Sequence, residues 1–293
     1  MQIKLATKYH VRSISFPSRS HPTTLRIEDE LNRLKTRDSS AVLTSESVSV
    51  GLSGLGDLYQ CMDDLLDMSS TQQVLAVHQH EKCVDALLDG YVRLLDVCGI
   101  ARDYMFQITE HVRALQSALR RRKGDSSIEN DILRYMSFRK AMKKQAKKLI
   151  TELKRMDEYN ELDASLCLDQ DHHFSAVIRV LRQVNGTNAC VFQSLLSFLS
   201  APASAKQRRR SLVAKLMHKG VIGCEEKRDV VNEIESADGA VCRARTLDAE
   251  KMRTAHKRLV ALESSIEGLE KRLECLFRHL IKARACLLNI ISR

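Results

Sequence analysis

The chain has 293 residues, a formal net charge of +10, few aromatic residues (4%) and no tryptophan. Its three prolines, Pro17, Pro22 and Pro202, leave most of the sequence free to form helices, and no alternating run of β-branched residues is long enough to predict a sheet. A β-rich fold is thereby excluded. The lack of any apolar run approaching about 18 residues also argues against a membrane-spanning helix.

The cysteines indicate a reducing compartment. Nine of them are scattered along the chain, and none forms a C-x-x-C pair. In a sequence without a secretory signal, this usage is typical of buried free thiols rather than of a disulfide framework. We therefore expect a cytoplasmic protein. The basic triplet Arg208–Arg210 resembles a nuclear-localisation patch, so the nucleus stays open as an alternative.

Residues 1–48 differ in composition from the remainder. No acidic residue precedes Glu28, whereas lysines and arginines recur among serines and threonines, as in a transit peptide. Leu25, Ile27, Leu31 and Leu34 nevertheless form a partial apolar stripe, which predicts a short helix from about 25 to 35. We expect residues 1–48 to be a largely disordered basic arm with one short helix, followed by a helical bundle domain over 49–293.

The arm contains one detailed recognition pattern. Arg12 stands three residues before Ser15, with Ser13 between them, and Pro17 follows two residues later. This string resembles the phosphoserine ligand of 14-3-3 proteins, in which an arginine cluster grips the phosphate and the proline turns the chain away. The alternative is an unmodified tail. The pattern predicts a candidate phosphosite and docking segment.

Helical periodicity begins near Gly51. A first helix is expected to about 67, a second from about 79 to 123, and a third from the capping-box sequence at 126–129 to about 156. Gly124 suits the turn between the last two, which predicts a long antiparallel hairpin. Beyond a polar connection at 157–171, shorter helices are expected at 172–184, ending at Asn185–Gly186, and at 189–200.

The strongest pattern is a heptad repeat in the last forty residues. A final long helix is expected over about 225–291, with Gly239 as the point where it would break. Its apolar seam repeats every 3.5 residues on average, as in a coiled coil, and consists of Leu259, Leu262, Ile266, Leu269, Leu273, Leu276 and Leu280. The seam requires a partner, either the chain's own hairpin or a second copy in a homodimer. The flanking positions lack a clean complementary charge code, which favours packing within the chain. The sequence thus predicts an all-α, elongated helical bundle.

No catalytic motif of comparable strength is present. His78, His80 and Cys83 are metal-ligand types, but a second ligand pair at a recognisable spacing is missing. Gly51–Gly54 is one residue short of a nucleophile elbow. We therefore expect a non-enzymatic protein without cofactor, metal or small-molecule substrate.

One basic helix face has a candidate binding role. It consists of Lys140, Lys143, Lys144, Lys147 and Lys148 on the third expected helix. Such a face is most often simply solvated, but it suits an anionic membrane surface as a peripheral contact. Specific nucleic-acid binding is disfavoured because no aromatic residues interleave with the lysines for base stacking.

Several longer segments together carry a family resemblance. They are Tyr9–Pro22 (YHVRSISFPSRSHP), Gly51–Tyr59 (GLSGLGDLY), Gln79–Asp85 (QHEKCVD), Leu94–Gly99 (LLDVCG), Arg120–Asp125 (RRRKGD), and matches between Ile266 and Ile291. On these segments the chain resembles the plant-specific Bypass-type family over nearly its whole length from Tyr9. The resemblance implies a role in root and shoot development without an established enzymatic activity. It assigns no catalytic residues, and it implies that the arm is retained.

Overall fold

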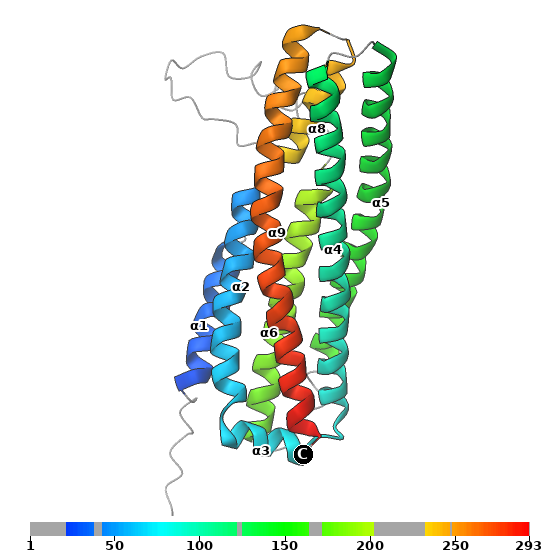
Figure 1. Cartoon of the computed structure of the whole chain (residues 1–293). Helices are drawn as coiled ribbons and strands as arrows, with labels where there is room; N and C mark the ends of the chain where they lie inside the picture. Colours follow the sequence, from blue (N-terminus) through cyan, green and yellow to red (C-terminus); the bar gives the residue numbers. More distant parts are fainter. Residues whose placement is uncertain are drawn as a thin grey trace, which may run out of the picture.

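The computed structural model describes residues 22–37, 43–121, 125–163, 172–201, 232–246 and 248–292. Within these ranges every regular element is a helix, which confirms the all-α prediction (Figure 1). No helix among the described residues is both long and apolar enough to cross a membrane. The helices are α1 (Pro22–Arg37), α2 (Ser45–Leu66), α3 (Ser69–Val77), α4 (Lys82–Arg121), α5 (Asp125–Asp163), α6 (His172–Leu199), α8 (Glu233–Ala244) and α9 (Ala249–Ile291).

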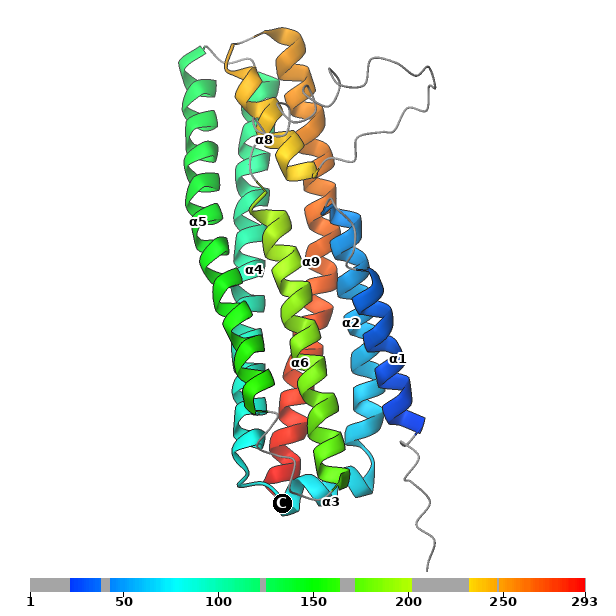
Figure 2. The ribbon, with the colours of Figure 1, turned by 180° about the vertical axis from the view of Figure 1, so that it is seen from behind.

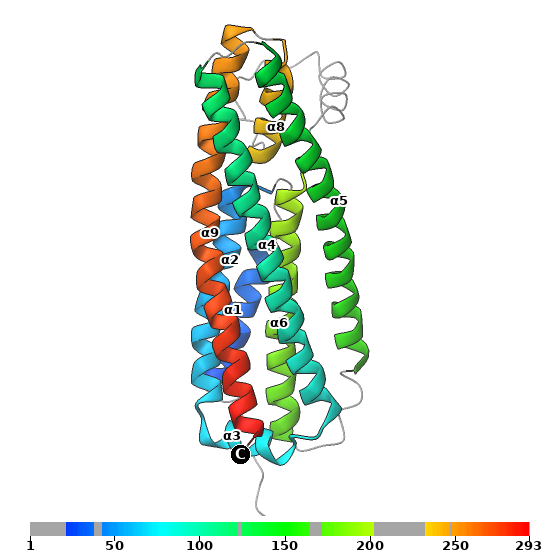
Figure 3. The same cartoon turned by 45° about the vertical axis from the view of Figure 1, so that its right-hand side comes forward.

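The helices form an elongated bundle. Helix α9 packs against α2, α4 and α8, and α6 packs against α2, α4 and α5. Seen from behind, α6 lies centrally, with α5 on one side and α1 on the other (Figure 2). Helix α5 runs along the outside of α4 and α6 (Figure 3). The short α3 closes the end near the C-terminus, and α8 lies at the opposite end.

The heptad seam of α9 faces the interior of the bundle. Its seven predicted members are each no more than 1% exposed: Leu259, Leu262, Ile266, Leu269, Leu273, Leu276 and Leu280. The helices that cover them belong to the same chain. Charged pairs flank the seam, including Arg113 with Glu263 at 2.6 Å and Arg102 with Glu274 at 2.7 Å between α4 and α9. The seam is therefore core, and a second copy would have to dock on another surface.

Helix α6 differs from the sequence expectation. The sequence predicted two helices separated at Asn185–Gly186, whereas α6 runs unbroken from His172 to Leu199. Asn185 is buried, and its Nδ2 donates to the Leu87 carbonyl of α4 at 3.4 Å. Packing on both sides of this dipeptide therefore outweighs its low helix propensity.

The expected helix over about 225–291 also differs. Within the described residues it is two helices, since α8 ends at Ala244 and α9 begins at Ala249, and Gly239, the expected point of interruption, lies inside α8. Asp248 caps α9, because its Oδ1 accepts from the backbone N–H groups of Glu250 at 2.8 Å and Lys251 at 3.3 Å. The break lets α8 fold back on α9.

The first two described helices pack into the same bundle as the others. Helix α1 packs against α2 and α6 and buries Ile27, Leu31 and Leu34. Helix α2 already starts at Ser45, capped by Thr44, whose side chain accepts from the Ser47 backbone N–H at 3.2 Å. Residue 48 therefore lies within α2, and α1 packs on this helix.

Candidate anion-binding site

A buried carboxylate organises the polar interior near α8. Asp238 of α8 is fully buried and accepts hydrogen bonds from three side chains of α5. The Tyr135 hydroxyl donates to Oδ1 at 2.6 Å, the Arg139 guanidinium donates from Nε to Oδ1 at 3.1 Å, and the Lys143 ammonium donates to Oδ2 at 2.9 Å. We refer to Tyr135, Arg139, Lys143 and Asp238 as the Asp238 cluster.

Arg139 extends the Asp238 cluster to a third helix. Its side chain is 1% exposed, and its second terminal nitrogen donates to Asp238 Oδ2 at 3.2 Å. The first terminal nitrogen donates to the Leu199 carbonyl at 2.7 Å, at the C-terminal end of α6. A cation there also complements the helix dipole. One guanidinium thus joins α5, α6 and α8.

Burial changes the proton equilibria around Asp238. It raises the pKa of the Tyr135 hydroxyl well above its ordinary value, and the negative charge of Asp238 raises it further. The hydroxyl is therefore protonated at neutral pH and acts as a donor. Burial, followed by the Asp238 charge, also raises the pKa of the nearby Cys242 thiol, which disfavours the reactive thiolate.

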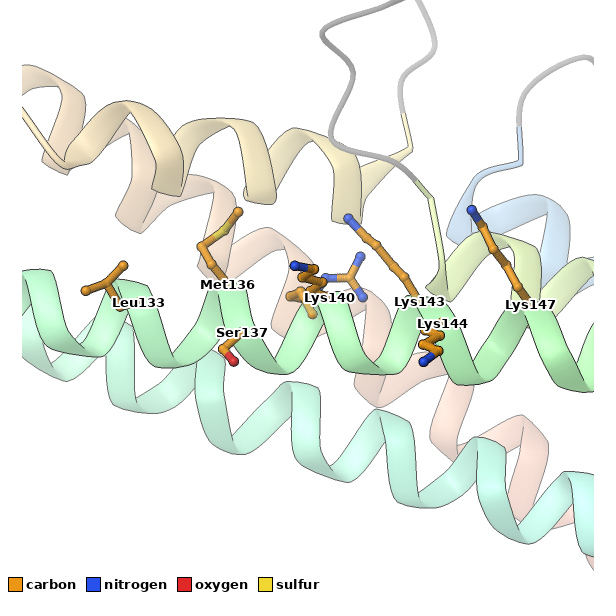
Figure 4. Close-up of a pocket in the computed structure, with 8 residues that line it drawn as sticks. Leu133, Met136, Ser137, Lys140, Lys143, Lys144 and Lys147 are labelled. Atoms are coloured by element: carbon orange, nitrogen blue, oxygen red, sulfur yellow. The ribbon is translucent and has the colours of Figure 1, made fainter.

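An open groove of about 770 Å³ lies over this part of α5, and we call it the lysine groove (Figure 4). Lys143 and Lys147 extend from α5 to the same side in that view. The groove is lined by Leu133, Met136, Ser137, Arg139, Lys140, Lys143, Lys144 and Lys147. Its floor therefore touches the Asp238 cluster through Arg139 and Lys143.

The predicted lysine face is divided by the structure. Lys140, Lys144 and Lys147 are exposed and line the lysine groove, and no carboxylate of a described residue pairs with them. Lys143 is only 21% exposed and is held by Asp238. Lys148 is not part of the lining and lies 3.8 Å from the Glu152 carboxylate. Of the five lysines of the predicted face, three are therefore exposed and unpaired among the described residues, and two pair with carboxylates.

The remaining predicted site residues have other surroundings. Arg12, Ser13, Ser15 and Pro17 lie outside the described residues. His78 stacks on Phe174 with ring centroids 4.2 Å apart, and Cys83 is buried in the core. In the part of the chain that the structure describes, no three His, Cys, Asp or Glu side chains are grouped as metal ligands.

The sequence analysis did not identify Arg139 or Asp238, although both leave a visible signal. Arg139 occupies the apolar stripe of α5 between Tyr135 and Met142, and Asp238 stands beside Ala237 on the buried stripe of α8. A single charge at a core position of an amphipathic helix predicts a buried partner of opposite charge. Two such positions of opposite sign pointed to this pair.

The fold and the site together define an all-helical bundle protein with a basic groove above a buried ion cluster. The family model described as Protein BPS1 matches residues 51–290, and the chain belongs to this family. The match confirms the Bypass-type resemblance, and the family suggests a protein related to plant development. No curated protein and no solved structure matches the chain significantly.

Proposed function

We propose that this chain is a non-enzymatic regulatory protein that acts in root and shoot development by binding partners at the lysine groove and through its N-terminal arm. The observation that carries the proposal is the lysine groove itself. Three of its exposed side chains, Lys140, Lys144 and Lys147, carry ammonium groups that bind anions, while the carboxylate of Asp238 already accepts from three side chains. This arrangement suits recognition of a partner rather than transfer of a proton.

Affinity purification from plant tissue tests the role of the groove. The groove variant carries Lys140→Glu, Lys144→Glu and Lys147→Glu. The control variant carries Lys82→Glu, Lys257→Glu and Lys271→Glu, which change the net charge equally at exposed positions of α4 and α9. We expect proteins that co-purify with the wild type to be lost from the groove variant and retained by the control variant. Equal recovery with all three would contradict the proposal for the groove.

The arm is tested separately with Ser15→Ala. A phosphoserine preceded by Arg12 and followed by Pro17 is the chemistry that 14-3-3 proteins recognise. We therefore expect 14-3-3 proteins to co-purify with the wild type and not with Ser15→Ala. Ser13→Ala is the matched control, because it removes a neighbouring hydroxyl and leaves the Arg12–Ser15–Pro17 spacing intact. Identical 14-3-3 recovery with Ser15→Ala would remove the arm from the proposal.

A second candidate function is peripheral binding to an anionic surface through the same groove. The division of the lysine face favours it, since three ammonium groups remain available after Lys143 and Lys148 have found carboxylates. No aromatic side chain lines the described groove, which disfavours single-stranded nucleic acid. Binding to anionic vesicles that falls steeply with added salt, and falls in the groove variant alone, would support this candidate.

A further inference from the structure

We propose that the lysine groove is a binding site for a compact polyphosphate, the chemistry shared by inositol phosphates and phosphoinositide headgroups. This inference rests on the second candidate function and specifies its ligand. Three properties of the groove support it: its charge, its dimensions and the position of its hydrogen-bond donors.

Charge in the lysine groove is concentrated and mostly unneutralised. Five cationic side chains line it, and Asp238 is the one carboxylate that contacts them among the described residues. Four positive charges therefore remain on less than three turns of one helix. A ligand with several adjacent phosphates supplies a matching density of negative charge, whereas a single carboxylate does not.

The dimensions of the groove suit a small ligand. Lys140 and Lys147 are seven residues apart on α5, which corresponds to about 10 Å along the helix axis. The volume of about 770 Å³ lies within the range of roughly 300 to 1,000 Å³ found for small-molecule sites. A nucleic acid would need a longer basic track to neutralise successive phosphates. Three lysines over two turns instead span two or three phosphates on one ring.

Lys143 supplies a positioned donor at the floor of the groove. Its ammonium carries three N–H groups, and Asp238 accepts from one of them at 2.9 Å. The carboxylate is also held by Tyr135 and by two nitrogens of Arg139, so it does not depend on Lys143 alone. The ammonium is therefore held at the groove while two of its N–H groups remain available to a ligand. Because Asp238 already orders the Lys143 side chain, ligand binding costs less side-chain entropy there.

The rim offers a way to distinguish a lipid headgroup from a free polyphosphate. Leu133 is 48% exposed and lies with Met136 at one end of the lysine groove. A phosphoinositide seated on the lysines would bring its membrane surface toward one edge of the groove. Because Leu133 is an exposed apolar side chain of the lining, we expect Leu133→Ser to weaken vesicle binding and to leave binding of the soluble ligand unaffected.

Titration calorimetry on the full chain provides the first test, with inositol hexakisphosphate as the probe and inorganic phosphate as the low-charge comparison. We expect saturable binding of the hexakisphosphate at one site. The groove variant should bind more than about tenfold more weakly, whereas the control variant, with the same net charge, should bind within about twofold of the wild type. Equal losses in both variants would show general attraction to a basic protein and would overturn the inference.

A second variant and a second readout guard against misfolding. Lys140→Ala, Lys144→Ala and Lys147→Ala remove the charges with a residue of high helix propensity, so the helix content should remain unchanged by circular dichroism. Acetylation footprinting of the wild type should show that the hexakisphosphate protects Lys140, Lys144 and Lys147 but not Lys257 or Lys271. Unchanged affinity in the alanine variant, or uniform protection of all these lysines, would contradict the site.

Vesicle flotation separates the two sources of the ligand. Phosphatidylcholine vesicles containing phosphatidylinositol bisphosphate are compared with phosphatidylserine vesicles of equal total charge. Preferential flotation with the bisphosphate identifies a lipid headgroup, and binding of the soluble ligand without flotation identifies a free polyphosphate. If the protein neither floats with the bisphosphate vesicles nor binds the soluble hexakisphosphate, the proposed polyphosphate site is wrong. If protein partners still depend on the groove in the purification experiment, the proposed interaction function survives that failure.

Discussion

Arg139 and Asp238 form an ion pair in which both side chains are almost fully buried, with 3.1 Å between Nε and Oδ1. Burying two charges is costly, and their mutual attraction offsets that cost only where the geometry is good and other hydrogen bonds complete the set. Here Tyr135 and Lys143 donate further hydrogen bonds to the Asp238 carboxylate, and the Leu199 carbonyl accepts one from the Arg139 guanidinium. The pair fixes where α8 sits on α5 and α6.

Removal of one charge of this pair should destabilise the fold strongly. Asp238→Leu leaves the buried Arg139 uncompensated, at an expected cost of about 3 to 5 kcal/mol in the free energy of unfolding. The double variant Arg139→Met with Asp238→Leu should recover most of that loss, because neither charge then remains buried alone. Urea denaturation of the single and double variants measures both effects. A single-variant loss below about 1 kcal/mol would show that water reaches the Asp238 cluster.

The α9 seam gives a second prediction. Leu269→Glu with Leu273→Glu should yield a molten or unfolded chain, since each leucine is at most 1% exposed within its own bundle. The exposed Lys271 lies between them, and Lys271→Glu should change stability by no more than about 0.5 kcal/mol. Circular dichroism and size-exclusion chromatography distinguish the outcomes. A folded monomer from the double variant would instead mean that the seam holds two copies together.

The α9 seam was predictable because its signal is local and repeated. Spacings of three and four residues place the same side chains on one face whatever the partner is, so the sequence identified every seam residue. The partner itself was not predictable, because α2, α4 and α8 are brought to α9 by contacts far apart in the sequence. Long-range contacts also explain why the predicted break in α6 was wrong. Asn185 donates to the Leu87 carbonyl, which is 98 residues away in the sequence, and local helix propensity could not reveal this contact.

The candidate site was predictable only in part, for a related reason. Lysine spacing on α5 placed Lys140, Lys144 and Lys147 on one face, and the lysine groove contains all three. Spacing could not show that Lys143 is anchored by a carboxylate 95 residues later. The pair of Lys148 with Glu152, in contrast, has the i, i+4 spacing that brings side chains together on one helix. A long-range ion pair therefore distinguishes Lys143 from the lysines of the face that remain available to a ligand.

Stability should fall as the solution becomes alkaline. Burial raises the pKa of the hydroxyls of Tyr91 and Tyr135 above the ordinary value near 10. The unfolded chain then releases these protons at a lower pH than the folded chain does. Their stabilising contribution is full below about pH 10 and is lost as the pH rises above it.

Equilibrium denaturation at several pH values above neutrality tests this expectation. Each buried tyrosine should contribute a slope of up to about 1.4 kcal/mol per pH unit above about pH 10. Tyr91→Phe removes one titrating group, and its profile should be shallower than that of the wild type. Since the Tyr91 hydroxyl donates to the Met62 sulfur, a weak acceptor, at 3.3 Å, the loss of stability at neutral pH should be small. Identical profiles would contradict the assignment.

The docking of α1 on α2 should depend on Gly54. A Cβ atom added at Gly54 would lie 2.5 Å from Leu34 Cδ2 of α1, whereas one added at Gly56 would meet no atom within 4 Å. Gly54→Ala should therefore force Leu34 to move and cost about 1 to 3 kcal/mol through overpacking. Gly56→Ala, two residues further along the same helix, should gain about 0.5 to 1 kcal/mol from reduced backbone entropy in the unfolded state.

These two alanine variants form a matched pair for a single measurement. Both add one methyl group to α2, so any difference in the free energy of unfolding reports the local surroundings rather than helix propensity. Hydrogen exchange should localise the Gly54→Ala loss to α1, where Ile27, Leu31 and Leu34 would lose packing. Leu34→Ala combined with Gly54→Ala should cost less than the sum of the two single variants, because the shortened side chain leaves room for the new methyl group. Equal stability of the Gly54→Ala and Gly56→Ala variants would mean that α1 adjusts freely and is not fixed to α2 by this contact.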